Sequence, residues 1–206
     1  MKPVSKRDID ILEERGHWVA SSWLYKLIEK LIRKNLPVEL RYIKEAHRLM
    51  FQKANQGGIA GKYRNHNGPE LRRVDGTVLK MADWHNIPNI LAKIDVELRE
   101  FTKNLQPPKN ESEYRQIILE AARLSHQLAS VHPFVNGNGR ASRLLMNAIL
   151  KRAGLPVIAI KKSKKSYLMA MRQADDGDPS LLEDLIVSGL LENKRQNYNT
   201  VSKYRN

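Results

Sequence analysis

Apolar residues recur at helical spacing along most of the chain, so the sequence predicts a protein built mainly of α-helices. Such apolar faces predict a short helical segment over 8–15 and longer helices over 18–34, 38–55, 86–104, 111–131, 139–153, 162–174 and 179–197. Two helix starts carry their own signals: Asn110 with Glu113 resembles a capping box, and Asp178-Pro179 places a cap before a proline. We expect an all-α fold, a compact bundle of about eight helices.

One segment departs from the helical pattern. Between Gly57 and Asn86, pairs of turn residues separate short stretches, and Asp75-Gly76 lies between residues 72–74 and 77–79. An Asp-Gly pair between two β-prone stretches is a typical hairpin turn. The sequence therefore predicts one small β-hairpin within the helical fold.

The composition is typical of one globular domain. The chain has 206 residues, of which 41% are hydrophobic, so it can bury a substantial core. We expect a single domain over 1–206, with its core at about 40–192, N-terminal helices over 8–34 and a basic tail over 194–206. Cysteine is absent from the sequence, which excludes disulfides and cysteine-ligated zinc.

The first eight residues contain no apolar targeting segment, and no run approaches the roughly 20 apolar residues of a membrane span. The expected location is the cytoplasm, with secretion as an effector as the alternative. The net charge is +14, from 36 basic and 22 acidic residues, and its field would attract nucleotides, acidic proteins or nucleic acid. Lysine runs such as Lys161-Lys162 are most often solvated faces, so nucleic-acid binding is a minor hypothesis.

The densest candidate chemistry lies at residues 132–143, His-Pro-Phe-Val-Asn-Gly-Asn-Gly-Arg-Ala-Ser-Arg. Pro133 ends the preceding helix, because a residue before proline is driven out of the α region. The next helix begins directly after Gly-Asn-Gly, and the first turn of a helix presents unpaired N–H groups and a positive dipole. The sequence therefore predicts a phosphate site in this loop.

Side chains around the loop suit the same chemistry. Gly137 and Gly139 allow the backbone to approach a ligand closely. Arg140 and Arg143 are three residues apart, so both could bind one polyphosphate from the same helix face. His132 is suited to take a proton from an attacking hydroxyl near neutral pH. The alternative is a glycine-rich turn with solvated arginines, which needs no such combination of residues.

The segment resembles the signature of the Fic family, His-Pro-Phe-x-Asp/Glu-Gly-Asn-Gly-Arg-x-x-Arg, and departs from it only at Asn136. The resemblance runs from about residue 43 to 191. It includes three further elements: Gly61-Lys62-Tyr63-Arg64, Ile87-Pro88-Asn89-Ile90-Leu91 and Gly177-Asp178-Pro179. It implies a helical Fic-type domain that uses ATP and Mg²⁺ to transfer AMP to a Tyr, Thr or Ser hydroxyl of a target protein.

The resemblance also implies a role for each signature residue. His132 would be the general base, and Phe134 would anchor the loop in the core. Arg140 would bind the phosphates, and Arg143 would hold the γ-phosphate side. The anion hole for the phosphates would be formed by Gly137, Asn138 and Gly139. The Asn138 amide would face phosphate oxygens.

Asn136 stands where the family usually has an acid that coordinates Mg²⁺. An amide oxygen is neutral and a weaker ligand for this cation. Three consequences remain open: slower AMP transfer with magnesium held by the nucleotide and water, transfer of a different group, or nucleotide binding without turnover. Nucleotide binding without turnover would make the protein a catalytically weak interaction module related to a toxin.

Two further features bear on regulation and partners. Ser188 and Glu192 fit a Ser/Thr-x-x-x-Glu-Gly/Asn pattern that resembles the inhibitory helix of Fic proteins, where the glutamate would pair with Arg143; the alternative is a solvated glutamate. The hairpin would dock the target segment as an added strand, and the alternative is an ordinary surface hairpin. Its docking residues would be Val74, Thr77, Val78 and Leu79. Besides the target, an antitoxin or a second copy is an expected partner; a membrane is not.

Overall fold

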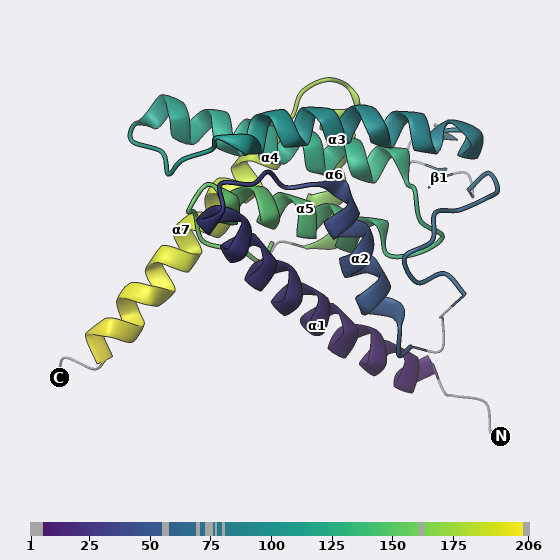
Figure 1. Cartoon of the computed structure of the whole chain (residues 1–206), viewed down its shortest axis with the longest axis horizontal. Coiled ribbons are helices and arrows are strands. Elements are labelled where there is room, and N and C mark those ends of the chain that lie inside the picture. The colour runs from purple at the N-terminus through teal and green to yellow at the C-terminus, as the bar shows by residue number, and fades with distance from the viewer. Residues whose placement is uncertain are drawn as a thin grey trace.

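The computed structural model describes residues 6–54, 58–68, 71–72, 76, 78–79, 81–160 and 163–203. This part of the chain forms seven α-helices: α1 (Lys6–Arg33), α2 (Leu40–Phe51), α3 (Ile87–Lys103), α4 (Glu111–Val131), α5 (Asn138–Arg152), α6 (Lys164–Asp175) and α7 (Ser180–Lys203). A 3-10 turn, η1 (Trp84–Asn86), precedes α3. The expected helical fold is confirmed (Figure 1).

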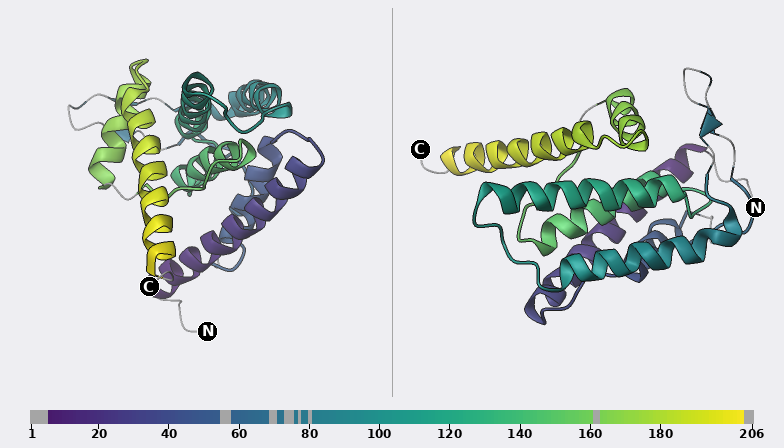
Figure 2. Two further views of the ribbon diagram at one scale, coloured as in Figure 1. Left: turned by 90° about the vertical axis from the view of Figure 1, so that its left-hand side faces the viewer. Right: turned by 90° about the horizontal axis from the view of Figure 1, so that it is seen from above.

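Helix α5 is the centre of the bundle (Figures 1 and 2). Its apolar face, which the sequence places at Leu144, Leu145, Ala148 and Ile149, is buried. So are three residues outside that face: Met146, Asn147 and Leu150. A helix that is buried nearly all round must be covered by neighbours on several sides. The one polar member of the three is satisfied, because Asn147 accepts from the Ile158 N–H at 2.8 Å and donates to its carbonyl at 2.9 Å.

The two N-terminal helical segments expected over 8–15 and 18–34 form one continuous helix, α1, so the described residues hold seven α-helices instead of about eight. Gly16 lies within this helix. A Cβ at Gly16 would come within 2.0 Å of the Met50 carbonyl oxygen on α2. The glycine therefore allows close approach of α1 to α2 and does not end the helix.

Two short strands, β1 (Leu71–Arg72) and β2 (Val78–Leu79), pair antiparallel in the segment where a hairpin was expected. Leu71 is opposite Leu79, and Arg72 is opposite Val78. Val74 and Thr77 lie outside the described residues. In both figures β1 lies at the end of the bundle where α1 begins, and the C-terminal half of α7 projects toward the other end (Figures 1 and 2).

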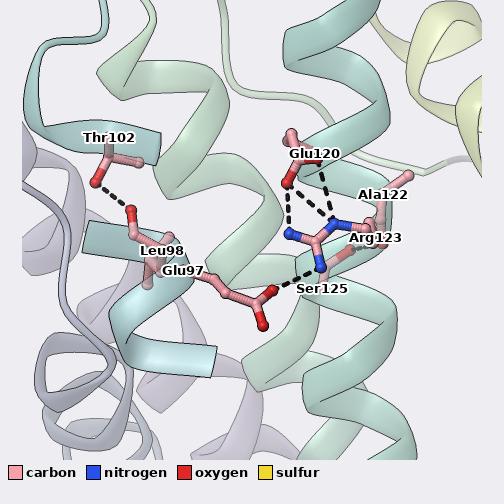
Figure 3. A network of polar contacts seen from close by, with 7 residues as sticks. All are labelled: Glu97, Leu98, Thr102, Glu120, Ala122, Arg123 and Ser125. Atoms are coloured by element: carbon pink, nitrogen blue, oxygen red, sulfur yellow. Dashed lines mark hydrogen bonds and ion pairs between the residues drawn. The ribbon is translucent and has the colours of Figure 1, made fainter. Parts of the chain in front are cut away.

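Helices α3 and α4 are joined by the network in Figure 3. Arg123 on α4 pairs with Glu97 on α3 at 2.7 Å and with Glu120 on its own helix at 2.7 Å. These side chains are partly exposed, so the pairs contribute on the order of 1 kcal/mol or less and mainly orient the two helices. None of the described helices is long and apolar enough to cross a membrane.

Candidate active site

The site begins where α4 ends. His132 follows Val131 as the C-cap and has left-handed backbone angles, φ 51° and ψ 57°. Pro133 has no N–H and cannot continue the helix. A non-glycine residue in this region costs on the order of 1 kcal/mol, so surrounding contacts must hold His132 there.

Arg64 supplies those contacts. Its side chain is buried, and its Nε donates to the His132 carbonyl at 2.7 Å. The guanidinium also donates to the carbonyls of Val131, His66 and Ala82. The Arg64 backbone N–H donates to the Pro133 carbonyl at 2.8 Å. One buried cation thus ties the end of α4 to the segments before and after the strand pair.

The loop after His132 is closed by Phe134 and Asn138. Phe134 is buried in the core and forms an isolated antiparallel bridge with Tyr63. The Asn138 side chain is buried as well, accepting from the Phe134 N–H at 2.8 Å and donating to its carbonyl at 2.8 Å. Asn138 was expected to turn its amide toward phosphate oxygens. The structure instead uses that amide to close the loop.

Helix α5 starts without a side-chain cap. Its N-cap is Gly137, with φ 79°. The first-turn N–H groups of a helix have no intrahelical acceptor, and here the cap residue has no side chain to supply one. A Cβ at Gly137 would lie 2.6 Å from the ring of Phe51, so the loop backbone lies directly against α2. The start of α5 is therefore suited to bind an anion.

Arg140 is paired with a carboxylate that the sequence did not single out. Its Nη2 lies 2.8 Å from Oε2 of Glu13 on α1, and both side chains are mostly buried. The guanidinium also lies over the ring of Phe51, 4.8 Å from the centroid. The Arg140 guanidinium, which was expected to bind phosphates, is thus paired with the Glu13 carboxylate.

Arg143 lies near the same turn. Its Nη1 would be 3.3 Å from a Cβ at Gly139, and its guanidinium lies over Tyr167 on α6, 5.4 Å from the centroid. Burial lowers the pKa of His17 on α1, and the charges of Arg140 and Arg143 lower it further. Both arginines therefore act electrostatically on one imidazole.

Residues 37–150 match the family model of Fic/DOC proteins. The chain belongs to the Fic/DOC family. Among curated proteins it is similar to protein adenylyltransferase Fic of Drosophila willistoni, with 26% identity over 174 residues, which cover 81% of this chain and 30% of that protein. It is also similar to the Nematostella vectensis protein of the same name, with 50% identity over 62 residues, which cover 29% of this chain and 14% of that one.

Solved structures share the fold of this Fic/DOC chain. A Fic-1 structure from C. elegans has a TM-score of 0.73 at 23% identity, covering 100% of this chain and 55% of that one. A Fic domain containing signaling protein from Bacteroides thetaiotaomicron has a TM-score of 0.70 at 22% identity, covering 93% and 72%. The chain spans less than a third of the length of the curated relatives described above.

Asn136, where this Fic/DOC chain departs from the signature, is exposed, and its oxygens already have partners. Its side-chain Oδ1 accepts from the Gly137 N–H at 2.7 Å, and its carbonyl oxygen is 2.8 Å from Nε2 of His47. The described residues contain no group of three or more His, Cys, Asp or Glu that could hold a metal ion. The loop therefore offers Mg²⁺ one neutral oxygen, which fits a dedicated magnesium site poorly.

Ser188 and Glu192 are not at this site. Ser188 is exposed on α7, and Glu192 accepts from Gln196 of the same helix at 2.8 Å. Within the described part of the chain, the carboxylate paired with a signature arginine comes from α1, and the expected pairing of Glu192 with Arg143 is not confirmed.

Proposed function

We propose that this chain is a protein adenylyltransferase that transfers AMP from ATP to a Tyr, Thr or Ser hydroxyl of a target protein. The observation that carries the proposal is the uncapped start of α5, with His132 on one side of the loop and Arg140 and Arg143 on the other. Nucleotide binding is supported by two solved relatives of the same fold. They are BepC of Bartonella tribocorum with bound AMPPNP and a Fic domain of Bartonella quintana with bound ADP, with TM-scores of 0.56 and 0.56.

His132 acts as the general base. Burial lowers its pKa, a hydrogen bond to the Ala129 backbone opposes this, and the charge of Arg64 lowers it further. The neutral ring donates one N–H to the Ala129 carbonyl, which leaves a lone pair on the other nitrogen. That nitrogen takes the proton as the target oxygen attacks the α-phosphorus, and the bond to the bridging oxygen breaks to release pyrophosphate.

The phosphates bind at the start of α5. The backbone N–H groups of Asn138, Gly139 and Arg140 face the phosphate oxygens, and Arg140 and Arg143 neutralise the charge. Mg²⁺ accompanies the nucleotide, and no step above depends on a protein-held metal. The hairpin docks the target as an added strand through the four residues named above. Val78 on β2 belongs to that set, and its side chain is exposed.

The reaction is tested with ATP labelled on either the α- or the γ-phosphate, incubated with the protein and a lysate. AMP transfer leaves the α-label on protein and the γ-label in pyrophosphate. Retention of the γ-label on protein would show phosphate transfer instead. Binding of ATP without either label on protein would identify a catalytically silent nucleotide-binding module, which is the second candidate and is favoured by the Glu13–Arg140 pair.

Removing the carboxylate from Arg140 tests whether Glu13 restrains the site. We expect Glu13→Gln to tighten AMPPNP binding by roughly threefold to tenfold, because the guanidinium no longer has to leave an acid before it meets a phosphate. Isothermal titration measures the affinity. Glu192→Gln is the matched control and should leave it unchanged; equal effects of the two substitutions would contradict the assignment.

The metal hypothesis is tested at Asn136. Asn136→Asp keeps an acceptor for the Gly137 N–H and adds a charge that a hard cation prefers. The Mg²⁺ concentration that gives half-maximal AMP transfer should fall by roughly tenfold. Asn136→Ala serves as control and should not lower it. An unchanged magnesium dependence in the aspartate variant would show that this position does not contact the metal.

A further inference from the structure

A buried histidine outside the signature links two loops of the site. His47 on α2 is fully buried. Its Nδ1 is 3.0 Å from the Gly61 backbone N–H, which donates to it. The ring proton must therefore be on Nε2, which donates to the Asn136 carbonyl at 2.8 Å. Both ring nitrogens are used, and each bond goes to the backbone of a different loop.

The ring also packs closely against the signature loop. It stacks on Phe134 with centroids 3.8 Å apart and planes 7° apart, and it lies 4.7 Å from the ring of Phe51. A Cβ at Gly137 would be 3.3 Å from Nε2. Burial lowers the pKa of His47 to about 4, so near neutral pH the ring is neutral and keeps its single proton for Asn136.

The Asn136 carbonyl and the Gly137 N–H belong to one planar peptide group, and they point in opposite directions. Fixing the carbonyl on His47 therefore fixes the orientation of the whole peptide. That peptide leads directly into the N-cap of α5. If it rotated, the left-handed geometry of Gly137 and the first-turn N–H groups after it would change direction.

We propose that His47 is a positioning residue of the phosphate site: its Nε2–H bond to Asn136 holds the signature loop in the conformation that aims the first turn of α5 at the nucleotide. The proposal rests on the proposed function, since it takes a nucleotide phosphate as the ligand. His47 itself contacts no phosphate. Its influence passes through the backbone of Asn136 and Gly137.

Three substitutions separate the two hydrogen bonds from the packing of the ring. The Gln amide nitrogen is as many bonds from Cα as Nε2, so His47→Gln keeps a donor for Asn136. The Asn oxygen is as many bonds from Cα as Nδ1, so His47→Asn keeps an acceptor for Gly61. His47→Phe keeps an aromatic ring against Phe134 and loses both bonds.

We expect the dissociation constant of AMPPNP to rise about tenfold in His47→Asn and His47→Phe, as the loss of one well-placed hydrogen bond implies. His47→Gln should stay within about threefold of the parent. The maximal transfer rate should follow the same order. The unfolding temperature of each variant is measured alongside, because a residue that serves only the core would change affinity in proportion to stability.

A His47→Gln variant as weak as His47→Asn, or equal affinity in the parent and all three variants, would overturn the role of His47. A parent that binds AMPPNP but labels no protein would contradict the proposed function, while the AMPPNP affinities of the variants would still test the role of His47. A parent that binds no AMPPNP would end both.

Discussion

The rate of AMP transfer is expected to fall by about 10²–10⁴-fold in His132→Ala, the range for loss of a general base. The substitution removes the only group assigned to take the proton of the target hydroxyl. The fold should survive, because Arg64 binds the backbone carbonyl of His132 and not its ring. AMPPNP affinity should stay close to that of the parent, since the ring does not hold the phosphates. Single-turnover kinetics and calorimetry measure the two quantities.

His126→Ala is the matched control. His126 lies on α4, the helix that His132 caps, and bonds to Asp175 of α6 at 2.9 Å. Its loss should cost some stability without a comparable loss of rate. Full labelling by His132→Ala, or an equal loss of rate in the control, would contradict the assignment of the base.

The pH dependence follows from the same residue. The pKa of His132 is lowered from 6.5, mainly by burial. The ring therefore stays neutral, and able to accept a proton, below that value. The rate should persist as pH falls to 6.5 and decline only as it passes through the lowered pKa. A decline centred above 6.5 in the profile of kcat/KM would show that another group is the base.

The second large effect is expected from Gly137→Ala. Alanine at φ 79° costs on the order of 1–2 kcal/mol. Its Cβ would also lie 2.6 Å from the fully buried ring of Phe51, an overlap that adds roughly 1–3 kcal/mol. The free energy of unfolding should therefore fall by about 3 kcal/mol, and AMPPNP binding should be lost because the loop can no longer lie against α2.

Two other glycines serve as controls, which separate the cost of the positive φ angle from the cost of the overlap with Phe51. Gly177 has φ 94° and open space around it, so Gly177→Ala should cost only the backbone term, on the order of 1–2 kcal/mol. Gly139→Ala meets only the flexible tip of Arg143 at 3.3 Å and should cost less. Chemical denaturation measures all three. If Gly137→Ala were no more destabilising than Gly177→Ala, the contact with Phe51 would not matter.

The sequence predicted the features that depend on local pattern. The helices follow from apolar periodicity and from caps such as Asn110, whose side chain accepts from the Glu113 N–H at 3.0 Å. The signature loop could be located because Pro133 and Gly137 end one helix and begin the next within a few residues. The caps and the loop residues both act on neighbours that are close in the sequence.

The sequence did not predict contacts made across the fold. The sequence placed separate helices over 8–15 and 18–34, because the contact that Gly16 between them makes with Met50 depends on the packing of α1 against α2. Glu13 was missed for the same reason, and nothing in its neighbourhood marks it as a partner of an arginine. His47 did carry a signal, since it lies four residues after Ile43 on the apolar face of its helix, where an uncompensated polar group is costly.

A structure of the protein with bound AMPPNP tests the central claim most directly. We predict phosphate oxygens within hydrogen-bonding distance of the first-turn N–H groups of α5, Arg140 turned from Glu13 to the phosphates, and the His132 ring beside the α-phosphorus. Phosphates bound instead in the open groove of about 1130 Å³ between α4 and α7, with the Glu13–Arg140 pair intact, would contradict the account.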